Sequence, residues 1–168
     1  DRGEETSEEG MATIAARARK MGKAVVICND GPGFVVNRIL GPYINEAGFL
    51  VEEGNSIESI DKAMVDFGMP MGPLALLDEV GIDVAAHVGP IMLAEFGDRL
   101  TPPPTMPKLL ADNRKGRKNE RGFYLYGTNA TKGKKEVDVS IYKTLGSEPK
   151  SQPPGEASQV TDTTPFQN

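Results

Sequence analysis

One stretch decides the fold of this chain: Asn29-Asp-Gly-Pro-Gly-Phe-Val-Val-Asn37-Arg38. The hydrophobic pattern changes there, from the apolar run 24–28, which is typical of a buried strand, to an amphipathic pattern with helical spacing. Two glycines and the proline between them allow a sharp turn of defined shape. We therefore expect one domain to end before this turn and another to begin after it, with Asn37 and Arg38 in the first turns of the new helix.

The residues before the turn predict one helix and one strand. Thr6-Ser7-Glu8-Glu9 fits a capping box with Thr6 as the cap, and apolar residues then recur at helical spacing over 11–21. The apolar run 24–28 is the expected strand. Because one strand cannot satisfy its own backbone hydrogen bonds, this pair is predicted to be the last α/β unit of a larger domain.

The residues after the turn predict a set of packed helices. Apolar side chains recur at i, i+3, i+4 and i+7 over 36–51 and again over 57–67, where Asp61 falls outside the apolar stripe. A third pattern covers 74–96, with Gly81 as a break between two helices. The middle of the chain is therefore expected to be entirely helical.

Cap and breaker residues divide these helices. Ser56 is expected to cap the second one, and Pro73 suits the first position of the third. Pro42 lies inside the first pattern, where it removes one backbone hydrogen bond, so we expect a kink there. Residues 106–113 form a short helix at most.

The C-terminal part changes in character. A basic, glycine-containing loop leads into three aromatic residues within 116–127, which we call the latch because it is predicted to fold back onto the helices. Residues 128–168 are rich in Lys, Gly, Pro and Ser and are predicted to be mostly irregular. Within them, 137–145 has the composition to dock locally.

The composition is typical of a soluble protein of a reducing compartment. Apolar residues make up 38% of the chain and concentrate in 11–126, enough for one domain with appendages. A net charge of -5 argues against nucleic acid as a partner, and the basic cluster 108–121 is more typical of a solvated loop than of an anion site. The single Cys28 cannot form an internal disulfide, and no apolar run approaches the ~20 residues of a membrane span.

The sequence itself contains no complete active site. One histidine, one cysteine and scattered carboxylates lack the spacing of a zinc site, and no Gly-x-Gly-x-x-Gly fingerprint for a dinucleotide occurs. His87 falls on the apolar side of its helical pattern, so it is predicted to be a packed or hydrogen-bonded structural histidine.

Asn37 and its neighbours are the candidate site residues. An amide at the start of a helix suits the orientation of a hydroxyl or carbonyl, although spacing alone favours a capping or hinge-bracing role. By the same argument, the sequence favours Arg38 as an interdomain ion-pair partner over Arg38 as a catalytic residue. The segment Met69-Pro-Met-Gly-Pro73 could line a slot for an apolar chain, but a turn with core packing is the simpler account.

Three ordered motifs give the chain a resemblance to a known family, the 3-hydroxyacyl-CoA dehydrogenases. They are Asp30-x-x-Gly-Phe-Val-x-Asn37-Arg38-x-x-x-Pro42-Tyr-Ile44, Pro70-Met-Gly-Pro-x-x-Leu-Leu-Asp78-x-Val-Gly-Ile-Asp83 and Gly116-Arg-Lys-Asn-x-x-Gly-Phe-Tyr124. The last motif and the following Gly133-Lys-Lys-Glu-Val-Asp-x-x-Ile-Tyr142 are most similar to the α subunits of bacterial fatty acid oxidation complexes. Three motifs at the correct spacing are far more specific than any one of them.

The resemblance implies a mainly α fold. In that family a Rossmann domain binds NAD, a helical C-terminal domain closes over the acyl-CoA, and a His-Glu pair of the Rossmann domain is the general acid/base. Residues 1–30 would then be the last helix and strand of an incomplete Rossmann domain, and 31–127 the helical domain. Residues 128–168 would be a linker or the start of a second helical repeat.

The resemblance also implies roles for particular residues. Asn37 matches the asparagine that orients the substrate oxygen and the catalytic histidine. The implied substrate contacts are Arg38, Met69, Met71, Gly72 and Pro73. His87 does not stand at the position of the catalytic histidine, so we expect this chain alone neither to bind NAD tightly nor to oxidise 3-hydroxyacyl-CoA.

The implied setting is fatty acid β-oxidation in the bacterial cytoplasm. The implied partners are acyl-CoA, NAD bound by the full-length enzyme, a second copy through the helical domain, and a thiolase β subunit; neither nucleic acid nor a membrane span is expected. Two alternatives stay open, namely a non-catalytic helical module for dimerisation and the C-terminal domain of a related hydroxy-acid dehydrogenase.

Overall fold

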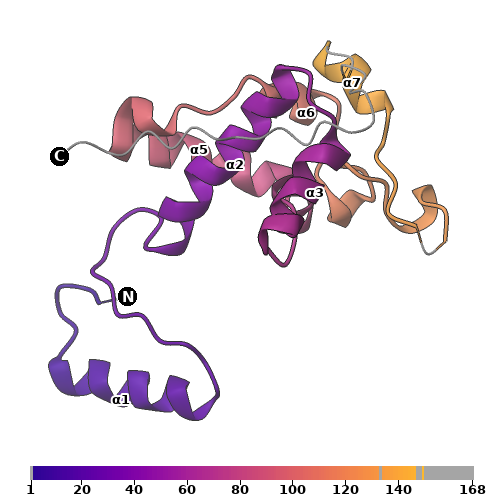
Figure 1. Ribbon diagram of the computed structural model, residues 1–168. Coiled ribbons are helices and arrows are strands. Elements are labelled where there is room, and N and C mark those ends of the chain that lie inside the picture. Colours follow the sequence, from indigo (N-terminus) through magenta and orange to yellow (C-terminus); the bar gives the residue numbers. More distant parts are fainter. Residues whose placement is uncertain (1, 133, 147–148, 150–168) are drawn as a thin grey trace.

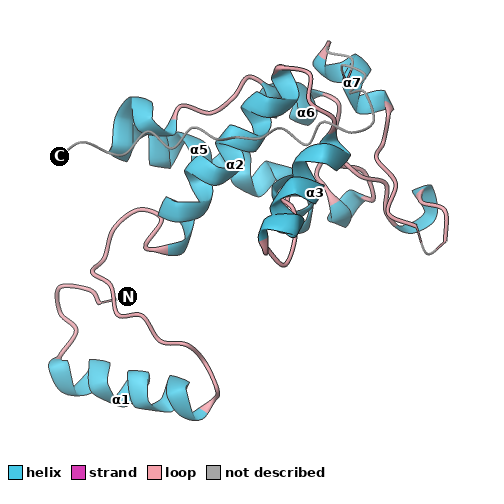
Figure 2. Cartoon of the chain, in the orientation of Figure 1, coloured by secondary structure: helices cyan, strands magenta, loops and turns pink. Residues whose placement is uncertain are grey.

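The computed structural model describes residues 2–132, 134–146 and 149. Helices dominate these residues, and the described part of the chain contains no strand, only isolated β-bridges (Figure 2). The helices in chain order are α1 (Glu8–Lys20), α2 (Val36–Glu52), α3 (Ile57–Phe67), α4 (Pro73–Val80), α5 (Ile82–Phe96), the 3₁₀ turn η1 (Gly97–Leu100), α6 (Thr105–Ala111), the 3₁₀ turns η2 (Arg117–Asn119) and η3 (Gly127–Asn129), and α7 (Ser140–Leu145).

The helices α2 to α7 pack around one hydrophobic core, while α1 lies apart from them (Figure 1). α2 packs against α3, α4, α5 and α6 and so occupies the centre of this group. The core joins residues from α2, α3, α4, α5, α6, the latch and α7, and its buried members are Ala47, Val51, Ile57, Ile60, Leu74, Ala75, Leu77, Ile82, Leu109, Phe123, Tyr124, Ile141 and Leu145.

The caps and breaks of the central helices confirm the prediction. The Ser56 hydroxyl accepts a hydrogen bond from the Ser59 amide at 3.2 Å at the start of α3, and Pro73 is the first residue of α4. Gly81 separates α4 from α5 with a φ of 104°, a backbone angle that favours glycine. α2 continues through Pro42, and the kink expected there stays a prediction.

The N-terminal unit differs from the prediction in two ways. Ser7, not Thr6, caps α1, because its hydroxyl accepts from the Gly10 amide at 3.1 Å. The expected strand 24–28 is wrong: these residues make no ladder, and two hydrogen bonds tie only Cys28 and Asp30 to Arg2. No neighbouring strand within the described residues offers the row of partners that a sheet needs. Whether residues 1–30 belong to a larger Rossmann domain stays a prediction.

The latch folds back onto the helices as expected. Phe123 and Tyr124 are buried in the core, and Tyr126 packs partly buried against it. The local docking expected of 137–145 is confirmed, because Ile141 and Leu145 of α7 join the same core. Residues 150–168, which are predicted to be irregular, lie outside the described residues.

Arg114 connects the latch to α7 and is fully buried. Its guanidinium donates to the Gly122 carbonyl at 2.7 Å and to the Ser140 hydroxyl at 2.6 Å, and it pairs with Asp112 at 2.8 Å and Asp138 at 2.7 Å. A buried guanidinium is tolerated only when its donors and its charge find such partners. This network explains how a polar segment is held against the core.

Among the described residues, no single helix is long and apolar enough to cross a membrane. The helix α4 and the segment Ile82–Leu100 reach that length and composition only as a pair, which bends by 98°.

Candidate functional site

An apolar groove of about 510 Å³ runs along α2. Its walls come from α2, α4, α5 and the proline-rich segment 102–107, and the buried Leu74 and Phe123 also line it. Three polar side chains line this otherwise apolar surface, namely those of Asn37, Asn45 and Thr105. A concave, mostly apolar surface with few polar groups is the usual form of a small-molecule or partner site.

The polar side chains of the groove differ in what they contact. Asn45 donates to the Thr101 carbonyl at 3.2 Å, and Thr105 donates to the Glu52 carboxylate at 3.0 Å. The Asn37 amide has no hydrogen-bond partner among the described side chains and backbone groups, and it does not cap its own helix, because α2 begins without a side-chain cap. The capping role that spacing alone favours for Asn37 is therefore wrong, and its amide is available to a ligand.

The turn before α2 places Asn37 at one end of the groove. Gly33 has a φ of 75°, and Phe34 follows it with a φ of 45°. The backbone amide of Asn37 donates to the Gly33 carbonyl at 3.0 Å, which makes the turn continuous with the first turn of α2. The predicted position of Asn37 in the first turn of the helix is confirmed.

Arg38 contacts the same turn and does not line the groove. Its Nε donates to the Pro32 carbonyl at 2.9 Å, and its guanidinium lies 4.9 Å from the centre of the Phe96 ring. Within the described part of the chain it makes no ion pair. Its substrate-binding role stays a prediction.

The segment Met69–Pro73 does not line the groove together with Asn37. A Cβ atom on Gly72 would lie 2.3 Å from the Asp61 carboxyl carbon, so glycine is needed for this close approach. Asp61 accepts from the amides of Leu74 and Ala75 at 2.8 and 3.1 Å and caps α4. The turn is thus a structural one, and the substrate contacts expected of Met69, Met71, Gly72 and Pro73 stay a prediction.

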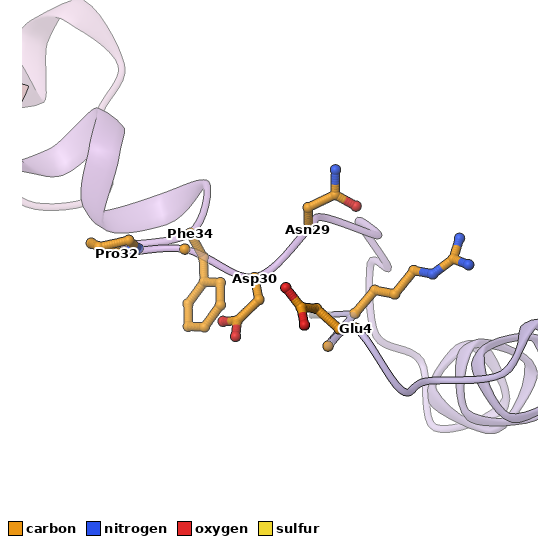
Figure 3. A pocket seen from close by; sticks show the side chains of 9 residues that line it. Glu4, Asn29, Asp30, Pro32 and Phe34 are labelled. Atoms are coloured by element: carbon orange, nitrogen blue, oxygen red, sulfur yellow. The ribbon is translucent and has the colours of Figure 1, made fainter. Parts of the chain in front are cut away.

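His87 lies exposed on α5, so the prediction of a packed histidine is wrong. In the described residues, no group of three or more His, Cys, Asp or Glu side chains is arranged to hold a metal ion. A second hollow of about 740 Å³ lies at the turn itself, lined by residues 2–4 and 29–34 (Figure 3). Asn37 is not among its lining residues.

The comparisons with known proteins identify the family. A sequence model described as 3-hydroxyacyl-CoA dehydrogenase, C-terminal domain, matches residues 33–126, more than half of the chain. The chain belongs to the 3-hydroxyacyl-CoA dehydrogenase family. The match begins at Gly33 in the turn and ends at the last aromatic residue of the latch, so it covers the first motif from Gly33 onward and the whole of the last motif.

Relatives and solved structures of this dehydrogenase family agree with the match. The fatty acid oxidation complex subunit alpha of Shewanella halifaxensis is 54% identical over 146 residues, which cover 87% of this chain and 20% of that protein. Among solved structures, the (S)-3-hydroxybutyryl-CoA dehydrogenase of Ralstonia eutropha is 40% identical with a TM-score of 0.69, covering 76% of this chain and 46% of that one. The 3-hydroxybutyryl-CoA dehydrogenase of Escherichia coli is 34% identical with a TM-score of 0.68, covering 83% and 31%. The chain spans about a fifth of the length of the curated relative.

Two buried carboxylates hold the helical domain of this chain together, and sequence reasoning missed both. Asp61 accepts from the Tyr124 hydroxyl at 2.8 Å, and Asp78 accepts from the amides of Phe123 and Tyr124 at 3.0 and 2.9 Å and from the Tyr126 hydroxyl at 3.0 Å. Asp61, which the pattern places outside the apolar stripe of its helix, is only 3% exposed. The available sequence signal for the burial of Asp78 was its position directly after Leu76 and Leu77.

Asp78 should make the stability of this helical domain depend on pH. Burial, the largest effect, raises the pKa of Asp78 to about 6, although the hydrogen bonds from Tyr124, Phe123 and Tyr126 lower it. The folded state therefore binds more protons than the unfolded state between about pH 4 and 6, and stability falls as the pH rises through that window. We expect the free energy of unfolding to increase by about 2 kcal/mol from pH 7 to pH 4.5.

Urea denaturation at several pH values measures this dependence. The Asp78→Asn variant is the control, because it keeps the shape of the side chain and removes the titration. Its free energy of unfolding should lack the increase seen in the parent chain. An increase of equal size in both chains would assign the effect to another group.

Proposed function

We propose that this chain is the substrate-closing part of an NAD-dependent L-3-hydroxyacyl-CoA dehydrogenase of fatty acid β-oxidation. The observation that supports it is the free amide of Asn37 at the end of an otherwise apolar groove, in a domain of this family. An amide offers one acceptor and two donors, which suits a hydroxyl that becomes a carbonyl. Asn37 would orient this oxygen and the acid/base histidine supplied by the rest of the protein.

NAD would be bound outside this chain. The sequence has no Gly-x-Gly-x-x-Gly motif, so no strand-turn-helix of the kind that holds a dinucleotide pyrophosphate can be placed in it. When bound, NAD accepts the hydride from C3 of the substrate. The residues of this chain would position the substrate, exclude water from the apolar groove and close over the acyl-CoA.

The same helices would also form a dimer with a second copy. Val36 and Ile39 on α2 are 63% and 65% exposed, and Phe67 on α3 is 81% exposed. Large apolar side chains on adjacent helices favour association, and identical copies most often associate through the same face. The name of the Shewanella halifaxensis relative supports a place in a fatty acid oxidation complex. A thiolase β subunit as the further partner and the bacterial cytoplasm as the location are proposed from the family resemblance alone.

Replacement of Asn37 by alanine tests the proposed function in the full-length protein that contains this chain. We expect kcat for oxidation of 3-hydroxybutyryl-CoA to fall at least about tenfold, because one positioned hydrogen bond in a water-excluded site is lost. NADH formation followed by absorbance measures the rate. Circular dichroism of the variant checks that it is folded.

Asn45→Ala is the matched control, since Asn45 lies on the same helix and lines the same groove but already donates to Leu100 and Thr101. Its kcat should change less than that of Asn37→Ala. Unchanged turnover of Asn37→Ala together with a weakened dimer would favour the alternative, a non-catalytic dimerisation module. Activity on a hydroxy acid that is not a CoA thioester would favour a related dehydrogenase.

A further inference from the structure

Two side chains of α5 act on the turn that orients Asn37, one by direct contact and the other through Arg38. The first is Met92, which is 4% exposed. A Cβ atom on Gly33 would lie 2.7 Å from both Sδ and Cε of Met92, so the thioether rests directly on the backbone of the turn. The same Cβ atom would lie 3.3 Å from the Asn37 Cβ. Met92 therefore limits where Gly33, and with it the start of α2, can lie.

The second side chain is Phe96, which acts through Arg38. The guanidinium of Arg38 lies over the Phe96 ring at 4.9 Å and donates to the Pro32 carbonyl at 2.9 Å. A Cβ atom on Gly31 would lie 2.7 Å from the Arg38 guanidinium, so Arg38 touches two successive residues of the turn. The ring keeps the long Arg38 side chain in the orientation that these contacts need.

Met92 and Phe96 stand four residues apart on α5, so both side chains project from the same face of this helix. One contacts the turn directly and the other contacts it through Arg38. The buried Met92 also lines the apolar groove beside Asn37. One face of α5 thus restrains Gly33 directly and residues 31–32 through Arg38, while no backbone hydrogen bond joins α5 to the turn in the described residues.

We propose that Met92 and Phe96 are positioning residues that fix the turn 31–34 and thereby the orientation of the Asn37 amide. The proposal rests on the proposed function, because it gives Asn37 a contact with the substrate. In this arrangement α5 sets the direction of the first turn of α2. A change in either side chain alters the placement of the amide, which affects the chemical step more than substrate binding.

The full-length protein carrying Phe96→Leu tests the proposal. Leucine keeps an apolar side chain at this half-buried position and removes the ring face under Arg38. We expect kcat for 3-hydroxybutyryl-CoA to fall about fivefold, the factor that corresponds to one cation–π contact, while KM changes less than about twofold. Phe96→Tyr retains the ring and should keep kcat within about twofold of the parent enzyme. Equal turnover of the parent enzyme, Phe96→Leu and Phe96→Tyr would overturn the proposal.

A double variant separates positioning from general damage. In an Asn37→Ala background, Phe96→Leu should lower kcat no further, because the group that it positions is already gone. If Phe96→Leu lowers kcat by the same factor in the Asn37→Ala background as in the parent enzyme, the proposal is overturned. Glu95→Ala, at the exposed neighbouring position of α5, should leave kcat unchanged.

Met92→Leu and Met92→Ala extend the test to the direct contact. Leucine nearly conserves volume and should keep kcat within about twofold, whereas alanine opens a gap at the turn. The kcat of Met92→Ala is measured at a temperature where circular dichroism shows that this variant is folded. If its kcat equals that of Met92→Leu, Met92 has no positioning role.

The outcomes distinguish this inference from the proposed function. If Asn37→Ala keeps full turnover, both fail, since no positioned amide contributes to catalysis. If Asn37→Ala loses turnover and the Phe96 and Met92 variants do not, the proposed function stands and only the role of α5 fails.

Discussion

Replacement of Arg114 by methionine is expected to lower the free energy of unfolding of this chain by about 3 to 5 kcal/mol, the cost typical of breaking a buried ion pair from one side. Arg114 is 0% exposed and pairs with Asp112 and Asp138. Methionine fills much of the space but leaves the Gly122 carbonyl and the Asp138 carboxylate without their main donor. The latch and α7 should therefore separate from the core first.

The pKa shifts of the two carboxylates agree with this account. Burial opposes ionisation of Asp138, yet hydrogen bonds from Ser140 and Arg114 and the charge of Arg114 outweigh it and lower its pKa. The pKa of Asp112 is also lowered, first by the hydrogen bond from Thr144 and then by Arg114 and Arg121. The ionised network is thus stabilised in the folded state at neutral pH.

Urea denaturation followed by circular dichroism measures the effect, and Arg121→Met is the matched control. Arg121 contacts the same two carboxylates at 3.1 and 3.3 Å, but its side chain is 36% exposed. Because exposed ion pairs contribute little, its loss should cost less than about 1 kcal/mol. If both variants lose the same free energy of unfolding, the burial of Arg114 does not make its ion pairs more important for stability than those of Arg121.

The helices of this domain could be predicted because their signals are local. Apolar spacing, the Ser56 cap, Pro73 and Gly81 each act within one or two turns of the chain, and the structure retains all of them. The strand expected at 24–28 failed for the opposite reason. A strand forms only where other strands complete it, and an apolar run does not specify them.

The buried polar groups could not be predicted from periodicity. Asp61 and Asp78 interrupt the hydrophobic pattern, yet folding brings the Tyr124 hydroxyl to Asp61 from 63 residues along the chain and the Phe123 amide to Asp78 from 45 residues along it. Arg114 looked like part of a solvated basic loop for the same reason. Charged residues are buried only where folding brings donors or counter-charges to them, and this depends on the whole fold.

The candidate site was predicted in part. Asn37 stood out from its place after the turn and from the family motif, but the groove that it faces is assembled from α2, α4, α5 and the segment 102–107. No single window of sequence contains this surface. The prediction for His87 failed: its place on the apolar side of the helical pattern suggested burial, but the side chain is exposed in the structure.

The purified chain alone should form NADH from NAD and 3-hydroxybutyryl-CoA at least about 10⁴-fold more slowly than the full-length protein does. The chain offers an amide at Asn37, and an amide neither gives nor takes a proton near neutral pH. His87 is the one histidine in the sequence, and it lies outside the residues that line the groove with Asn37. Orientation without an acid/base group leaves the hydroxyl proton of the substrate with no acceptor.

A stopped assay at high enzyme concentration, with the full-length protein as reference, measures this difference. His87→Gln in the full-length protein is the control and should keep the parent rate, because this exposed side chain has no part in the proposed chemistry. The opposite outcome is NADH formation by the purified chain that is lost when His87→Gln is introduced into the purified chain. That result would identify His87 as the general base and overturn the prediction that the chain lacks one. If Asn37 positions a substrate oxygen as proposed, the proton on that oxygen must pass to a group that is not among the residues lining the groove.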